Sequence, residues 1–168
     1  MNIKSKLPIA LLAFLVLQLG CVKLPDRVDS PNIRVNYSNT NGKAEYTLIF
    51  SCILQNDNPN TVLVDLSANV EVSIRQSDIV EIFPIKAKSI LPFNLEIVES
   101  VQKRTREEIL PLMEALDIDE SELIEDGTIP GIFFRSSEAR LTEIKSSNMR
   151  IKDYLKGKMK ERLNENDN

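Results

Sequence analysis

Hydrophobic and polar residues alternate in several separate segments between residues 33 and 98. A period of two predicts half-buried β-strands, because successive side chains of a strand point to opposite faces of the sheet. The predicted strands cover residues 33–37, 45–54, 61–66, 68–74, 79–85 and 90–98. Many short strands separated by turn residues are typical of a β-sandwich or a β-barrel.

The most apolar of these segments is 45–54. One of its faces carries Tyr46, Leu48, Phe50, Cys52 and Leu54. Its other face carries Ile49 and Ile53. Since both faces hold large apolar side chains, we predict a central strand that is covered on both sides.

Turn residues separate the strands. Asn41-Gly42 follows the first strand, and Asn58-Pro59-Asn60 follows the second. Asparagine tolerates turn geometry, and proline pre-sets its own backbone angle, so we expect Asn58-Pro59-Asn60 to form a surface turn. Pro84 and Pro92 cannot donate to a sheet ladder, which confines them to strand ends, edges or bulges.

The period changes after residue 104. Apolar residues then fall at helical spacing, at Ile109, Leu112, Met113 and Leu116. Thr105 and Glu108 fit a capping box, which predicts a helix over 105–116. Pro111 opposes a regular helix, so the helix either kinks there or begins near it. A strand is expected at 132–134, and 137–144 is compatible with a strand or a helix.

A last helix is predicted over 150–163. Ile151, Leu155, Met159 and Leu163 recur at steps of four, and the remaining positions are rich in Lys and Arg. We expect this helix to pack on the domain or to be solvated. The alternative is a helix that lies on a membrane surface.

The first 21 residues read as an export signal. Lys4 and Lys6 precede an apolar run over 7–19, and Gly20 and Cys21 follow. This order is typical of a secretory signal peptide, and the run is too short for a membrane span of roughly 20 residues. Residues 17–21 resemble a bacterial lipoprotein box, in which the cysteine is acylated and becomes the first residue. The box is a relaxed one, because Gln18 and Leu19 depart from its usual residues.

Cys21 is therefore the predicted lipidation site. The alternatives are an ordinary secreted chain and an uncleaved N-terminal anchor. The expected organisation is a signal peptide (1–20), a tether (21–31), a globular domain (32–148) and a C-terminal helix with a frayed tail (149–168).

Composition excludes several classes of function. Without residues 1–20 the chain has 19 basic and 25 acidic side chains, a net charge of −6, which argues against nucleic-acid binding. The chain has no histidine, so it cannot hold a Ser-His-Asp or Cys-His catalytic centre. Cys52 lies in an apolar segment and is expected to be a buried, unpaired thiol. We expect no enzyme activity, no catalytic residues, no metal site and no cofactor.

An acidic segment covers 113–127. It holds Glu114, Asp117, Asp119, Glu120, Glu122, Glu125 and Asp126. A calcium loop could begin at Asp117 and Asp119, but Ser121 and Glu122 stand where such a loop needs an acid and a glycine. We therefore favour a solvated helix surface for this segment.

The order of elements resembles the late-embryogenesis-abundant (LEA) type 2 domain, also called the water-stress-and-hypersensitive-response domain. A hydrophobic strand leads into Asn58-Pro59-Asn60, an aliphatic strand and an alternating strand follow, and a polar linker over 85–89 precedes another strand and a helix. The family's glycine-rich region is replaced by residues 75–78. The resemblance covers about 100 residues and implies a mainly β fold. That fold is a fibronectin-III/immunoglobulin-like antiparallel β-sandwich with one inserted helix and a C-terminal helix.

These features predict a lipoprotein of the bacterial cell envelope, anchored to a membrane through Cys21. Its LEA type 2-like domain is expected to be non-enzymatic and to serve in binding, stress tolerance or envelope maintenance. Its expected partners are the membrane and an envelope protein or a lipid ligand. The alternative is a carrier of lipid or another hydrophobic ligand.

Overall fold

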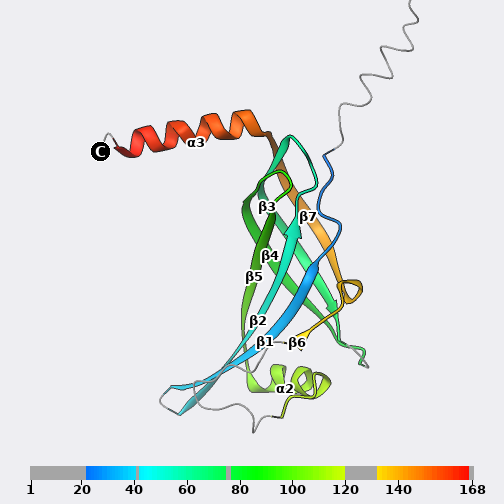
Figure 1. The fold of residues 1–168 in the computed structure, drawn as a ribbon. Helices are drawn as coiled ribbons and strands as arrows, with labels where there is room; N and C mark the ends of the chain where they lie inside the picture. Colours follow the sequence, from blue (N-terminus) through cyan, green and yellow to red (C-terminus); the bar gives the residue numbers. More distant parts are fainter. Residues whose placement is uncertain (1–21, 41, 75–76, 120–131, 167–168) are drawn as a thin grey trace, which may run out of the picture.

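The computed structural model describes residues 22–40, 42–74, 77–119 and 132–166 (Figure 1). The described residues are mainly β, with 57% strand, and form two antiparallel sheets and two α-helices. Strand order is β5-β2-β1-β6 in the first sheet, called sheet A, and β4-β3-β7 in the second, called sheet B. The predicted β-sandwich with one inserted helix and a C-terminal helix is therefore confirmed.

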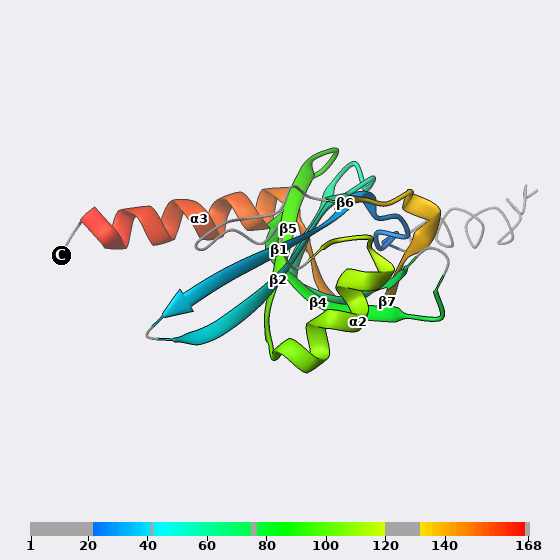
Figure 2. The same ribbon diagram turned by 90° about the horizontal axis from the view of Figure 1, so that it is seen from below.

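The strands run the length of the sandwich and the helices lie at its two ends (Figures 1 and 2). The elements are β1 (Asp29–Thr40), β2 (Lys43–Gln55), β3 (Thr61–Ser73), β4 (Val80–Ile90), β5 (Leu95–Arg104), α2 (Arg106–Ala115), β6 (Ile132–Phe133), a 3-10 turn (Ser136–Glu138), β7 (Ala139–Arg150) and α3 (Ile151–Asn166).

The inner faces of the two sheets form the core. Every second residue of β2 is buried there, as its alternating pattern predicted. Phe50 of β2 stacks on Phe83 of β4, with ring centroids 4.5 Å apart, and so joins sheet A to sheet B. Both rings are fully buried, and such a stacked pair adds about 0.5–1.5 kcal/mol to the free energy gained by burial.

One long side of the sandwich is closed by contacts between β4 and β5. The Gln102 side-chain amide donates to the Ile82 carbonyl at 2.9 Å. Arg104 pairs with Glu81 at 3.0 Å, and both side chains are mostly shielded from solvent. Pro84 lies in β4, an edge strand of sheet B, which confirms the expected confinement of this proline.

Two predicted strands are one. The strands predicted at 61–66 and 68–74 form the single strand β3, which ends at Ser73 and is irregular near Asp65. Asp65 has a positive φ of 50°, and the pairing with β7 shifts register beside it. A bulge of this kind keeps pairing continuous while it breaks the alternation, so the sequence pattern suggested two pieces.

Two further boundaries differ from the sequence pattern. The segment 90–98 was predicted as a strand, but residues 91–94 form a turn and β5 begins at Leu95. Of the ambiguous segment 137–144, residues 139–144 belong to strand β7, which extends to Arg150, and Ser137 and Glu138 belong to the 3-10 turn before it.

Helix α2 covers one end of the core with Ile109, Leu112 and Met113. Its predicted capping box is confirmed: the Thr105 side chain accepts from the Glu108 backbone, and the Glu108 carboxylate accepts from Thr105 N–H at 2.9 Å. The helix runs from Arg106 through Pro111, so it does not begin at the proline.

The segment that precedes β1 is held on the sandwich. Val28 is buried in the core, Pro25 is buried, and Val22 and Leu24 pack against core residues. β1 begins at Asp29, three residues before the expected domain boundary. The described part of the predicted tether therefore belongs to the folded domain.

Candidate functional site

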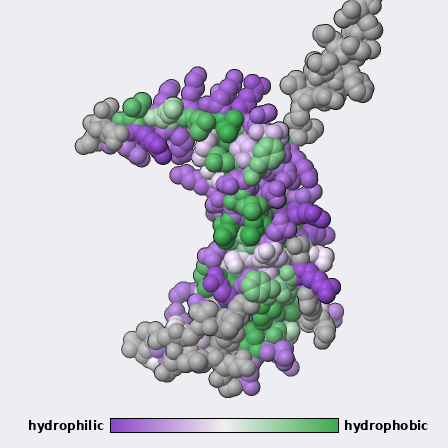
Figure 3. Space-filling model, viewed as in Figure 1, coloured by the Kyte–Doolittle hydropathy of each residue, from purple (hydrophilic) through white to green (hydrophobic). Residues whose placement is uncertain are grey.

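The outer face of sheet A is the most apolar exposed surface that the sheets present. Exposed side chains on it include Leu95, Ile97, Val101 and Phe133. Ile97 and Phe133 keep 70% and 71% of their surface in contact with solvent. Apolar side chains gather midway along the sandwich in the space-filling view (Figure 3). Exposed apolar side chains that gather on one face mark binding sites more often than singly scattered ones do.

This face corrects the prediction for β2. The strand is central in sheet A, between β1 and β5, as expected. It is not covered on both sides, because Ile49 and Ile53 on its outer face are only partly buried. The large apolar residues on the second face of β2 therefore contribute to a surface and not to a second core layer.

Strand pairing arranges the outer side chains in rows across the sheet. Asn32 of β1 faces Phe133 of β6 on one side and Ser51 of β2 on the other. Ser51 in turn faces Glu99 of β5. The neighbouring rows hold Arg34, Ile49 and Val101, and then Ile53 and Ile97. Polar side chains of β1 thus lie between the apolar residues of β5 and β6.

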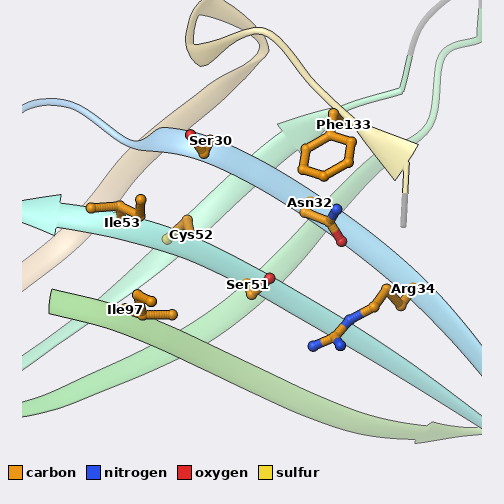
Figure 4. Close-up of a pocket in the computed structure, with 8 residues that line it drawn as sticks. All are labelled: Ser30, Asn32, Arg34, Ser51, Cys52, Ile53, Ile97 and Phe133. Carbon is orange, nitrogen blue, oxygen red and sulfur yellow. The ribbon is translucent and has the colours of Figure 1, made fainter. Parts of the chain in front are cut away.

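A shallow depression of about 430 Å³ lies among these rows (Figure 4). Its lining consists of Ser30, Asn32, Arg34, Ser51, Cys52, Ile53, Ile97 and Phe133. In the close-up the Phe133 ring stands over Asn32, while Ile53 and Ile97 lie side by side on neighbouring strands. The local backbone is irregular here: Ser30 has a positive φ of 48° and the pairing of β1 with β2 shifts register between Asp29 and Asn32.

The polar groups of β1 are only partly satisfied. Arg34 Nη2 donates to Glu99 Oε1 at 2.9 Å across the face of the sheet. Three buried atoms have no hydrogen-bonding partner among the described residues: Asn32 Oδ1, Arg34 Nε and Asn36 Oδ1. A buried polar atom without a partner costs about 1–3 kcal/mol of free energy, so these three atoms mark a strained part of the sheet.

Cys52 is buried and free, as the sequence predicted. Burial and, to a smaller extent, the negative charge of Asp29 raise the pKa of the Cys52 thiol to about 12. The thiol is therefore protonated at neutral pH, and a protonated thiol is a poor nucleophile. This chemistry suits a structural residue.

The predicted lipidation site, Cys21, lies outside the described residues. The same holds for most of the acidic segment, of which Glu114, Asp117 and Asp119 are described. Among the described residues no three His, Cys, Asp or Glu side chains cluster as metal ligands would. The calcium alternative and the expected absence of catalytic residues stay predictions.

A cluster of hydrogen-bonded asparagine side chains lies at the end of the sandwich opposite α2. Asn56 is fully buried and its side-chain amide donates to the carbonyls of Thr61 and Ile90 at 2.9 and 2.8 Å. Its Oδ1 accepts from the backbone and the side chain of Asn58. The predicted turn at Asn58-Pro59-Asn60 is present between β2 and β3, but Asn58 is only 8% exposed.

Asn58 connects this turn to the N-terminal segment. It makes hydrogen bonds to the backbone of Lys23, and the Asn60 carbonyl accepts from Ile151 N–H at 3.1 Å. The segment that follows Cys21 and the first residue of α3 are thus both held by one turn.

Comparison with known proteins finds no matching family model, no similar curated protein and no similar solved structure. Within the residues described, no helix has the length and apolar character needed to cross a bilayer.

Sequence reasoning located Ile49 and Ile53 on a second apolar face but did not identify a binding surface. Phe133, Asn32 and Arg34 carried no sequence signal, because strands distant in the chain bring them together. The usable signal was the pair of isoleucines on the outer face of β2, where a strand with one solvated face would carry polar residues.

Proposed function

We propose that this protein is a membrane-anchored lipoprotein, attached through an acylated Cys21, whose β-sandwich is a non-enzymatic binding domain. The outer face of sheet A is the proposed binding surface, and its partner is another protein of the cell envelope. The observation that supports the proposal is the open apolar face around Ile97 and Phe133 with polar atoms of Asn32 and Arg34 at its centre.

The character of this face fits a protein partner. Interfaces combine an apolar centre with a few hydrogen-bonding groups, and aromatic and arginine side chains dominate their energetics. Phe133 and Arg34 supply these two side-chain types at neighbouring strands. The depression is shallow and open, which suits an inserted side chain better than an enclosed small molecule.

The resemblance to the LEA type 2 domain extends the proposal to stress tolerance or envelope maintenance. This extension is an analogy, since a fold hosts many functions. The alternative of a lipid carrier would use the same outer depression, because in the described part of the chain Phe50, Phe83 and the other buried side chains pack between the sheets.

Site-specific photocrosslinking in living cells tests the proposed surface. A photoreactive amino acid is placed at Ile97 or Val101 of sheet A and, as a control, at Lys86 or Lys145, which flank Ser67 in sheet B. We expect discrete protein adducts from the sheet A positions only. Adducts of lipid mass would support the carrier instead, and equal adducts from both sheets would contradict a specific face.

A further inference from the structure

Helix α3 projects from the sandwich with its apolar residues exposed. It leaves the end of the sandwich across the direction of the strands (Figure 1). Leu155, Met159 and Leu163 are 51–68% exposed, so the row of apolar residues does not pack on the described domain. The helix is solvated, and its apolar row has no partner within the part of the chain that the structure describes.

Contacts with β4 set the rotation of α3 about its axis. The Tyr154 hydroxyl lies 3.0 Å from Ser89 Oγ, which fixes that side of the helix toward the sandwich. Glu161 lies on the same side: a hydrogen bond from Lys158 and, more weakly, the positive charge of Lys88 on β4 lower its pKa. The side of α3 that carries Tyr154 and Glu161 therefore faces the body of the protein.

The apolar row lies on the other side of the helix. At about 100° per residue, Met159 and Leu163 are turned about 140–180° from Tyr154. Lys152, Lys156 and Lys160 lie next to this row, at positions that also point away from the sandwich. α3 holds five basic and three acidic residues, and three of the basic ones, Lys152, Lys156 and Lys160, place positive charge on this outward side.

The outward side of α3 lies at the end where the membrane anchor is proposed. The Asn60 carbonyl accepts a hydrogen bond from Ile151 N–H, and Asn58 Oδ1 accepts one from Lys23 N–H. Helix α3 and the N-terminal segment are therefore attached to the same turn. Cys21 precedes Lys23 by two residues, which span at most about 7 Å. An acyl chain on Cys21 would therefore bring α3 within reach of the same bilayer.

We propose that the side of α3 with Leu155, Met159 and Leu163 lies on a bilayer of anionic phospholipids, with Lys152, Lys156 and Lys160 against the headgroups. The geometry of this membrane contact rests on the proposed anchoring at Cys21. Apolar residues bordered by lysines are the pattern by which helices lie in the membrane interface. The weak amphipathicity of α3 suits a second contact, because the anchor raises the effective concentration of the helix at the membrane.

Tryptophan fluorescence tests this contact, since the chain contains no tryptophan. Met159→Trp places the fluorophore in the apolar row. Gly157→Trp is the matched control, because Gly157 lies on the opposite side and a Cβ there meets no atom within 4 Å. Each full-length protein is reconstituted into two kinds of vesicle. One contains phosphatidylethanolamine and phosphatidylglycerol, and the other contains phosphatidylethanolamine and phosphatidylcholine. In each, the second lipid carries brominated acyl chains.

We expect quenching in phosphatidylglycerol vesicles to be several-fold greater for Met159→Trp than for Gly157→Trp. The difference should disappear in phosphatidylcholine vesicles and at 1 M salt, where the Debye length is about 3 Å. Equal quenching of the two variants, or no quenching of Met159→Trp in phosphatidylglycerol, would overturn the proposal.

Charge reversal separates the lipid contact from folding and from the anchor. Lys156→Glu with Lys160→Glu should abolish the quenching of Met159→Trp, whereas Lys86→Glu with Lys145→Glu, on sheet B, should not. Both pairs should retain the thermal unfolding midpoint of the parent. Flotation of the Cys21→Ser variant tests the anchor alone. If this variant floats with the vesicles as the wild type does, the proposed anchor is refuted, and quenching of Met159→Trp that persists in the charge-sensitive form described above would leave the contact of α3 supported.

Discussion

The side-chain amide of Asn58 and the backbone of Lys23 form two reciprocal hydrogen bonds. Asn58 Oδ1 accepts from Lys23 N–H at 2.9 Å, and Asn58 Nδ2 donates to the Lys23 carbonyl at 2.7 Å. Asn56 holds Asn58 in place through its own Oδ1. The turn between β2 and β3 therefore anchors a segment that lies 35 residues earlier in the chain.

Asn58→Ala should destabilise the protein by about 1–3 kcal/mol, because it removes both side-chain partners of the Lys23 backbone and one of the two hydrogen bonds that Asn56 Oδ1 accepts. Hydrogen exchange over residues 22–28 should rise at the same time. Urea denaturation and exchange mass spectrometry measure the two effects. Asn60→Ala, in the exposed part of the same turn, should change stability by less than about 0.5 kcal/mol. Equal effects of the two substitutions would refute the assigned role of Asn58.

Cys21→Ser should move the protein from the membrane fraction to the soluble fraction, or leave the full-length precursor, because the acylated thiol is lost. Cell fractionation and mass spectrometry of the N-terminus detect these outcomes. Cys52→Ala is the control with the same loss of one thiol and should remain in the membrane fraction. An unmodified Cys21 in the wild-type protein would contradict the proposed anchor.

Cys52 should make stability depend on alkaline pH. Its pKa is raised to about 12 in the folded protein, against about 8.5 in an unfolded chain. The unfolded state then releases the proton first, so this stabilisation is complete below about pH 8.5 and is lost as the pH rises toward 12. The free energy of unfolding should fall by about 1.4 kcal/mol per pH unit across that window.

Urea denaturation at several pH values checks this slope. Cys52→Ala should reduce the slope while lowering the overall stability through the lost side chain. The native thiol should also resist alkylation until the protein is denatured. Rapid labelling of Cys52 in the native state would show that the thiol is not enclosed as the structure describes.

The same isoleucine-to-alanine change at two positions tests whether the outer face of sheet A is exposed to solvent. Ile97→Ala should change the free energy of unfolding by less than about 0.5 kcal/mol, because Ile97 is 70% exposed. Ile90→Ala removes the same atoms from a fully buried position and should cost about 2–5 kcal/mol. Thermal unfolding compares the two variants. A cost of several kcal/mol for Ile97→Ala would mean that another layer covers this face.

The local elements of this fold were largely predictable from the sequence. The buried face of β2 follows from strict alternation over 45–54, and the start of α2 follows from Thr105 and Glu108. Both patterns depend on residues within a few positions of one another, where backbone geometry alone determines which side chains share a face. The free, buried state of Cys52 follows from the same alternation.

Relations between distant segments depended on the tertiary structure. Residues 61–73 form one strand because β4 and β7 pair with it on both sides of the irregular Asp65. Ile49 and Ile53 are partly exposed because no described layer covers the outer face of sheet A. The residue pattern of β2 shows that its second face is apolar but does not show what packs against that face. The two hydrogen bonds between the Asn58 side chain and the Lys23 backbone likewise join segments that are far apart in the sequence, so no local periodicity predicts them.

The sequence by itself thus determined which residues form strands and helices and which of their faces are apolar. Only the tertiary structure decided that Phe133 stands beside Asn32 on sheet A and that α3 points its apolar row away from the sandwich. The physical reason is that side-chain periodicity is set by neighbouring backbone angles, whereas the exposure of a face depends on which strands and helices pack against it in space.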